Sequence, residues 1–166
     1  PTEGEATDTT DNSPHEVCTA REYFTNSAEV FDISTNTWQN LPNLPYMGPA
    51  SAVAIHAESP DESFIYIFMH GKCTLRYDIK DQLYTELGKL PVKEWHCFDV
   101  TVCHPYLKKS NGKIYCMGGI IDGIWSKRCF SYDIYTNEWE ELSLMRLPRR
   151  RSSLVCVDMH ITADSI

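Results

Sequence analysis

Four arginines lie close together near the end of the chain, at Arg146, Arg149, Arg150 and Arg151. Guanidinium groups pair with carboxylates or phosphates through two parallel hydrogen bonds, so such a cluster suits an acidic ligand. The chain itself is acidic, with a formal net charge of −8, and this stretch therefore creates a local positive field. We predict a binding surface for an acidic partner here, and an ordinary solvated basic loop is the alternative.

A second candidate binding segment, residues 120–125, is unusually apolar for a loop. If Ile124 and Trp125 are exposed, they would anchor a partner, because interface hot spots favour tryptophan beside arginine. Packing of these two side chains against a neighbouring loop is an equally weighted alternative. The loop at 92–96 offers Lys93 and Trp95 for the same kind of contact.

The seven cysteines are odd in number, form no C-x-x-C pair and fall mostly in apolar runs. This pattern predicts free, buried thiols in a reducing compartment, the cytoplasm or the nucleus. The pairs His96-Cys97 and Cys103-His104 are the alternative, as ligands of a metal. Zinc ligands are usually two to four residues apart and strand neighbours face opposite sides, so we expect no metal or other cofactor.

Catalytic motifs are missing from the sequence. Gly118-Gly119 ends a predicted strand but does not open a helix, so it is not a phosphate-binding loop. No G-x-S-x-G nucleophile motif occurs. Tyr115 and Cys116 are adjacent, but a strand explains both. We therefore expect no enzymatic activity.

One phrase occurs three times and must position these candidates: an aromatic residue, Asp, Ile, four mostly polar residues and a second aromatic residue. Its copies are 31–38, 77–84 and 132–139. Each copy predicts a β-hairpin, because β-branched and aromatic residues flank a run of turn-forming residues. We expect Asp32, Asp78 and Asp133 to cap their turns by accepting hydrogen bonds from backbone N–H groups.

Two further strand-like runs precede the second and the third hairpin. They are 50–56 and 64–70 before the second, and 99–104 and 113–117 before the third. Another run, 152–157, follows the last hairpin and has the character of a first strand. Four strands per unit, with glycine ending the second and an aromatic residue in the fourth, is a fairly specific pattern.

This pattern resembles the kelch repeat, whose units are four-stranded antiparallel blades of a β-propeller. The resemblance implies an all-β fold. At about 50 residues per unit, the chain holds roughly three of about six blades. A partial ring leaves blade faces and strand edges open. The chain is therefore interpreted as part of a longer propeller or, less favoured, as an arc closed by oligomerisation.

The resemblance also divides the chain. Residues 1–27 are expected to be an acidic flexible segment or a loop of an incomplete first blade, and 158–166 a tail or a continuation of the last blade. The blades themselves span 28–157. Their limits are 28–45 for the end of blade 1, 49–91 for blade 2, 96–148 for blade 3 and 149–157 for the start of blade 4.

In this family the loops that carry the arginines and residues 120–127 line one face of the propeller. The stretch around Arg151 is similar to the Pro-Arg-x-Arg sequence of BTB–kelch ubiquitin-ligase adaptors, where an arginine at this position can contact acidic peptides. The resemblance implies a substrate-recognition propeller, with cullin-3 recruited by BTB and BACK domains that these residues do not contain. A scaffold for actin or other cytoskeletal partners, and a copper enzyme of the galactose-oxidase type, are the alternatives.

Other partners fit the sequence poorly. An acidic net charge disfavours nucleic acid. No apolar run is long enough to span a membrane. Trp38 and Trp139 each begin an aromatic-x-x-Leu pattern that some autophagy-adaptor ligands use, but as the repeat aromatics they are expected to pack between blades.

Overall fold

The computed structural model describes residues 24–55, 63–102, 112–150 and 152–154. All of the regular structure in these ranges is β-strand, so the predicted all-β fold is confirmed. None of the described residues forms a helix long and apolar enough to cross a membrane. The predicted segments 1–27 and 158–166 lie largely or wholly outside the described residues.

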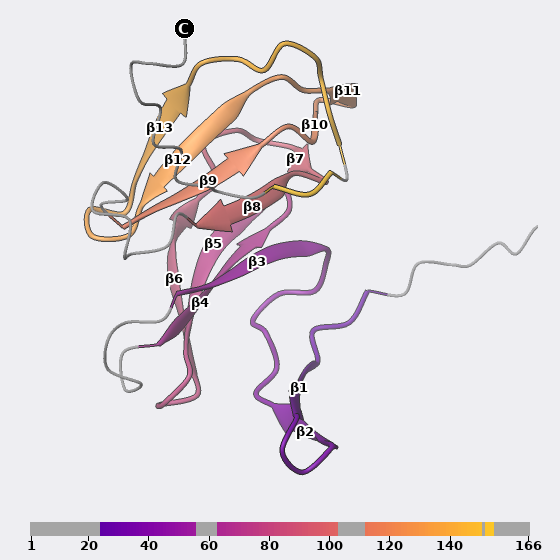
Figure 1. Ribbon diagram of the computed structural model, residues 1–166, viewed down its shortest axis with the longest axis vertical. Coiled ribbons are helices and arrows are strands. Elements are labelled where there is room, and N and C mark those ends of the chain that lie inside the picture. The colour runs from indigo at the N-terminus through magenta and orange to yellow at the C-terminus, as the bar shows by residue number, and fades with distance from the viewer. Residues whose placement is uncertain (1–23, 56–62, 103–111, 151, 155–166) are drawn as a thin grey trace, which may run out of the picture.

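Two four-stranded antiparallel sheets form the body of the molecule, as blades 2 and 3 (Figure 1). Blade 2 runs in chain order from its inner to its outer strand: β3 (Ala50–Ile55), β4 (Phe64–Met69), β5 (Cys73–Asp78) and β6 (Leu83–Lys89). Blade 3 has the same order: β8 (Asp99–Val102), β9 (Lys113–Met117), β12 (Cys129–Asp133) and β13 (Glu138–Leu142). The inner strands β3 and β8 lie side by side, which stacks the two blades face to face.

Blade 1 is represented by one hairpin, β1 (Ala28–Asp32) and β2 (Thr37–Leu41). Figure 1 shows it below the two sheets, joined to them by the chain that leads into β3. Its register matches the other two hairpins, because Phe31 pairs with Trp38 as Tyr77 pairs with Tyr84 and Tyr132 with Trp139. We call these three sets the hairpin pairs.

Each hairpin turns in the same way, and the aspartates are responsible as predicted. Each Asp Oδ1 accepts the N–H groups two and three residues later: Ser34 and Thr35 for Asp32 (2.8 and 3.3 Å), Lys80 and Asp81 for Asp78 (2.9 and 3.0 Å), Tyr135 and Thr136 for Asp133 (2.9 and 3.1 Å). The fourth turn residue then takes a left-handed conformation, with φ of 55° at Asn36, 52° at Gln82 and 60° at Asn137. Asparagine tolerates this conformation better than most residues.

The core lies between blades 2 and 3. Alternation along each strand sends one set of side chains into this seam, including Phe68 from β4 and Ile114 from β9. The hairpin pair of blade 3 faces blade 2, since the rings of Trp139 and Tyr132 lie 5.7 and 6.1 Å from that of Phe68. The fully or nearly buried members are Tyr66, Phe68, Leu90, Trp95, Phe98, Ile114, Cys116, Phe130 and Tyr132.

Three elements of the fold differ from the sequence-based expectations, and a fourth difference, at Trp95, concerns the candidate site. Residues 120–125 form a small hairpin instead of a loop. Trp38 was expected to pack between blades, yet its side chain is 67 % exposed because no described residue covers its face of the hairpin. Residues 152–154 are not in a strand, and the rest of the predicted strand 152–157 falls outside the described residues.

Replacing Trp139 with alanine should lower the free energy of unfolding by about 3 kcal/mol, because a large, partly buried aromatic side chain leaves the seam. Denaturant titration at dilute protein concentration measures this change. The matched control is Trp38→Ala, the same residue at the same repeat position but exposed, which should cost less than about 1 kcal/mol. Equal losses in the two variants would contradict the packing described here.

Candidate functional site

Two kinds of loop meet at one end of the blades. Inter-blade loops lead from the outer strand of one blade to the inner strand of the next, and 2–3 loops join the second and third strands within a blade. Backbone hydrogen bonds connect them: the N–H of Gly71 donates to the carbonyl of Trp95 (2.9 Å), and that of Gly119 donates to the carbonyl of Arg149 (2.8 Å). Residues 95 and 149 therefore hold equivalent places in successive inter-blade loops.

Glycine at 119 is required by this contact. Its φ of 81° is left-handed, and a Cβ there would collide with the carbonyl oxygen of His96. The second strand of blade 3 can thus end directly against two neighbouring inter-blade loops.

The 2–3 loop of blade 3 contributes two strands, β10 and β11, and the preceding inter-blade loop contributes a third, β7, to a small sheet in the order β11-β10-β7. Strand β10 (Ile120–Ile121) pairs with β11 (Ile124–Trp125) on one side and with β7 (Trp95–His96) on the other. Positive φ at Asp122 (50°) and Gly123 (79°) makes the tight two-residue turn. Side chains of β11 therefore stand at an open edge, with Ile124 73 % and Trp125 53 % exposed.

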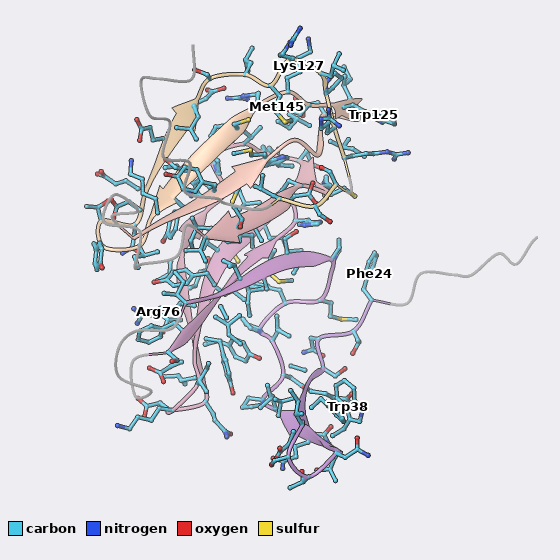
Figure 2. The ribbon with its side chains drawn as sticks, in the orientation of Figure 1. Phe24, Trp38, Arg76, Trp125, Lys127 and Met145 are labelled. Carbon is cyan, nitrogen blue, oxygen red and sulfur yellow. The ribbon has the colours of Figure 1, made fainter. Side chains whose placement is uncertain are left out.

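Trp125 lies next to the arginine cluster. The guanidinium carbon of Arg150 is 4.7 Å from the centre of the Trp125 ring. Trp125 is labelled at the upper right of Figure 2. The backbone holds the two segments together, because the carbonyl of Ser126 accepts the N–H of Arg149 (3.2 Å) and the N–H of Ser126 donates to the carbonyl of Gly119 (2.9 Å). This cation–π pair joins two sites that were predicted separately from the sequence.

The remaining cluster residues lie along the same inter-blade loop. Arg146 and Arg149 are exposed, and with Met145 and Leu147 they line an open pocket. None of Arg146, Arg149 and Arg150 forms an ion pair with another described residue, so their charges are available to a ligand. Arg151 lies outside the described residues.

Two predicted contact residues belong elsewhere. Lys93 is exposed on the loop between blades 2 and 3, beside a separate pocket at Lys72 and Val92. The prediction for Trp95 is wrong: the side chain is completely buried, its ring stacks on Phe98 at 4.1 Å, and its Nε1–H donates to the carbonyl of Gly118 (2.7 Å). A tryptophan in a loop sequence looks the same whether it faces a partner or the neighbouring blade.

His70 is a buried polar residue at the junction of blades 2 and 3 that the sequence analysis did not single out. The Cys97 N–H donates to His70 Nδ1 (3.2 Å), and Ser51 Oγ, which donates to the carbonyl of Phe98, lies 2.9 Å from His70 Nε2. Because Ser51 donates its one hydroxyl proton to Phe98, its oxygen can only accept a hydrogen bond from His70 Nε2. Nδ1 accepts the Cys97 N–H, so His70 is neutral with its proton on Nε2. Burial, with a smaller contribution from His96, lowers the pKa of His70 to about 4.

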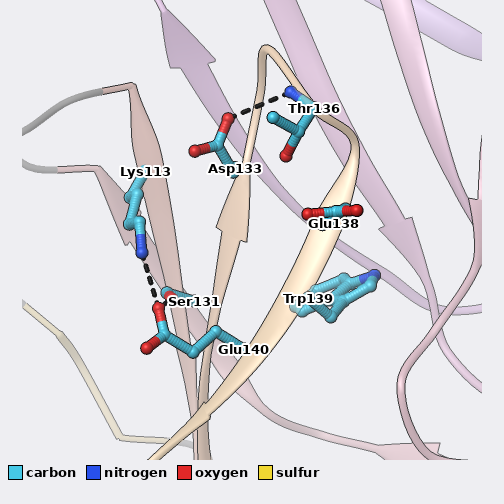
Figure 3. Close-up of a pocket in the computed structure, with 7 residues that line it drawn as sticks. All are labelled: Lys113, Ser131, Asp133, Thr136, Glu138, Trp139 and Glu140. Carbon is cyan, nitrogen blue, oxygen red and sulfur yellow. Dashed lines mark hydrogen bonds and ion pairs between the residues drawn. The ribbon is translucent and has the colours of Figure 1, made fainter.

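A further pocket, on the face of blade 3 away from blade 2, has charged groups that satisfy one another. Lys113 Nζ lies 2.6 Å from Glu140 Oε2, and Asp133 is occupied by its turn (Figure 3). Ser131 Oγ also donates to Glu140 (3.4 Å). The interactions in this pocket explain its polar residues without a ligand.

The cysteines within the described ranges are unpaired. Cys73, Cys116 and Cys129 are buried and Cys97 is half-buried, and burial raises the pKa of Cys116 well above its usual value. Among the described residues, no group of three or more His, Cys, Asp or Glu side chains is arranged to hold a metal ion. Cys103 and His104 lie outside those ranges.

Comparison with known families matches two segments, residues 18–45 and 110–146, to the Kelch motif. A search of the curated proteins found no match. The chain thus carries two kelch motifs, the first on the two-stranded β1–β2 hairpin and the second on the four-stranded antiparallel sheet of blade 3, consistent with part of a propeller. Kelch repeat domains are in general protein-binding modules. The middle blade, β3 to β6, has the same strand order as blade 3, although its sequence lies outside both matched segments.

The buried neutral imidazole of His70 predicts a pH-dependent stability. The unfolded chain binds a proton at His70 below its ordinary pKa of about 6.5, whereas the folded chain does so only near 4. Stability from this group is therefore complete above pH 6.5 and is lost as the pH falls toward 4. Denaturant titrations over this range should show a shallower slope for His70→Gln than for the wild type, and identical slopes would contradict the assigned role.

Proposed function

We propose that the chain is a protein-binding module that holds an acidic segment of its partner on the surface formed by Ile124, Trp125, Arg146, Arg149 and Arg150. We call these five residues the loop surface. The observation that carries the proposal is the stacking of Arg150 on the exposed ring of Trp125. An apolar anchor and an unpaired positive charge in one place are the usual elements of an interface hot spot.

The charges support an acidic partner. Arg128 also lies over an aromatic ring, Phe130 at 4.8 Å, but it forms two hydrogen bonds with Glu141, of 2.7 and 2.8 Å. Arg150 has the same stacking without a carboxylate among the described residues. A carboxylate of a ligand can therefore fill at Arg150 the place that Glu141 fills at Arg128.

The direct test is selection of peptides from a random peptide library on the immobilised protein. The selected peptides should be enriched in aspartate and glutamate. Their affinity should fall with rising salt, because salt screens ion pairs between exposed arginines and peptide carboxylates. Arg150→Ala and Trp125→Ala should each weaken binding of the best peptide about tenfold, which corresponds to about 1.4 kcal/mol. Titration calorimetry measures both changes.

Arg128→Ala is the matched control, because it removes a stacked arginine whose carboxylate partner is internal. It should leave the peptide affinity unchanged. Selection of peptides without acidic enrichment, or equal losses in Arg128→Ala and Arg150→Ala, would exclude this surface as the acidic-partner site.

We further propose that the module recognises substrates for a cullin-3 ubiquitin ligase, in the cytoplasm or the nucleus. Support comes from the kelch motifs and from the resemblance of the arginine-rich loop to that of BTB–kelch adaptors. The full-length product of the parent transcript should then contain a BTB domain and co-purify with cullin-3. Co-purification with actin in its place would favour the cytoskeletal scaffold.

A further inference from the structure

Two faces of this chain have the form of blade-to-blade contacts but lack a neighbour among the described residues. The first is on blade 1, where the Phe31–Trp38 hairpin pair has its rings 5.1 Å apart and is largely exposed. The equivalent pairs are covered by the blade before them. Trp139 packs on Phe68 of blade 2, and the hydroxyl of Tyr84 donates to the carbonyl of Pro42 in the preceding loop (3.0 Å).

The second such face is on blade 3, and its residues Tyr115 and Met117 are half-buried. In blade 2, Tyr66 and Phe68 of β4 receive the hairpin pair of the next blade, as the ring distances from Tyr132 show. Tyr115 and Met117 hold the corresponding register positions in β9: they pair with Ser131 and Cys129, as Tyr66 and Phe68 pair with Arg76 and Thr74. They alternate with the buried Ile114 and Cys116, so they face away from blade 2.

A leucine in each inter-blade loop also indicates that blade 3 lacks a neighbour among the described residues. Leu44, Leu90 and Leu147 each precede a proline in successive loops. Leu44 packs against Met69 and Leu75 of blade 2, and Leu90 is buried in the seam with blade 3. The loop of Leu147 is in the usual position, because the Gly119 N–H donates to the carbonyl of Arg149 as in the preceding loop. Leu147 is nevertheless 62 % exposed.

The two open faces are complementary to each other in charge as well as in form. Glu29 lies two residues before Phe31, as Leu75 lies two before Tyr77, and Leu75 belongs to the cluster that receives Leu44. By this equivalence Glu29 would meet the loop of Leu147, which carries the exposed Arg146 and Arg149. This placement of a glutamate opposite two arginines favours the alignment of the two faces in which Phe31 and Trp38 take the place of the next blade's hairpin pair.

We infer that the β1–β2 hairpin of one copy docks on blade 3 of a second copy of this chain, with Phe31 and Trp38 packed on Tyr115, Met117 and Leu147. The contact is head-to-tail, since the described residues of each copy present one face of each kind. Such a contact either closes into a ring or extends into an open chain, and in both cases the mass is that of two copies or more. The inference does not depend on the proposed acidic partner.

Size-exclusion chromatography with light scattering, over a dilution series up to submillimolar concentration, tests the inference. The wild type should change from monomer to dimer or larger species as concentration rises. Trp38→Glu, on the head face, and Leu147→Glu, on the tail face, should each abolish this association. Both side chains are exposed, so near-UV circular dichroism should show that the two variants stay folded.

Mixing the two variants gives the sharpest result. Trp38→Glu retains an intact tail and Leu147→Glu an intact head, so an equimolar mixture should form a one-to-one complex although neither variant associates alone. Tyr135→Glu is the control, because Tyr135 is equally exposed but lies at the hairpin turn of blade 3. It should associate like the wild type.

Two results would overturn the inference. One is a wild type that stays monomeric at every concentration, which would mean that the faces are covered within the chain or need a different blade. The other is association that persists in both glutamate variants, or that is lost equally in Tyr135→Glu. If the wild type self-associates as described but binds no acidic peptide, the result contradicts the proposed function and leaves this inference standing.

Discussion

The packing of one blade's hairpin pair on the second strand of the blade before it is the interaction on which the structure depends. Tyr132 and Trp139 supply it from blade 3, and Tyr66 and Phe68 receive it on blade 2. Blade 2 is apolar on both faces, with Phe68 on one and Leu75 on the other, so its burial requires a neighbour on each side. Burial at one seam therefore implies exposure wherever a neighbour is lacking, and exposed aromatic residues at such places indicate contacts to be made.

The repeated turn sequence provides the geometry that this packing needs. An aspartate that accepts two N–H groups closes each hairpin with a fixed register, and the register sets both members of the hairpin pair on one face. Hydrogen bonds that favour the charged carboxylate also lower the pKa of two of these aspartates: from the Ser34 hydroxyl and the turn N–H groups for Asp32, and from the Thr136 and Tyr135 N–H groups for Asp133. The local turn chemistry and the long-range packing thus agree, as expected of a sequence that specifies one fold.

The proposed binding surface lies where this regularity is relaxed. Trp95 and Arg149 occupy equivalent positions in successive inter-blade loops, and the same backbone hydrogen bond holds both. One side chain fills the core and the other is exposed beside Leu147. The added β10–β11 hairpin extends the loop end of blade 3 and presents Trp125 to Arg150. A repeated frame can in this way carry a binding surface on its loops.

The sequence by itself determined the strands of the two four-stranded blades, the three repeated hairpins and the aspartate turns, because each depends on residues a few positions apart. It also located the arginine cluster and the apolar segment 120–125 as candidates for binding. Only the tertiary structure decided that Trp95 is core while Trp125 is surface, that Arg150 stacks on Trp125, and that His70 joins two blades. Those outcomes depend on which loops meet across a seam, and the spacing of residues along the chain does not predict contacts between distant segments.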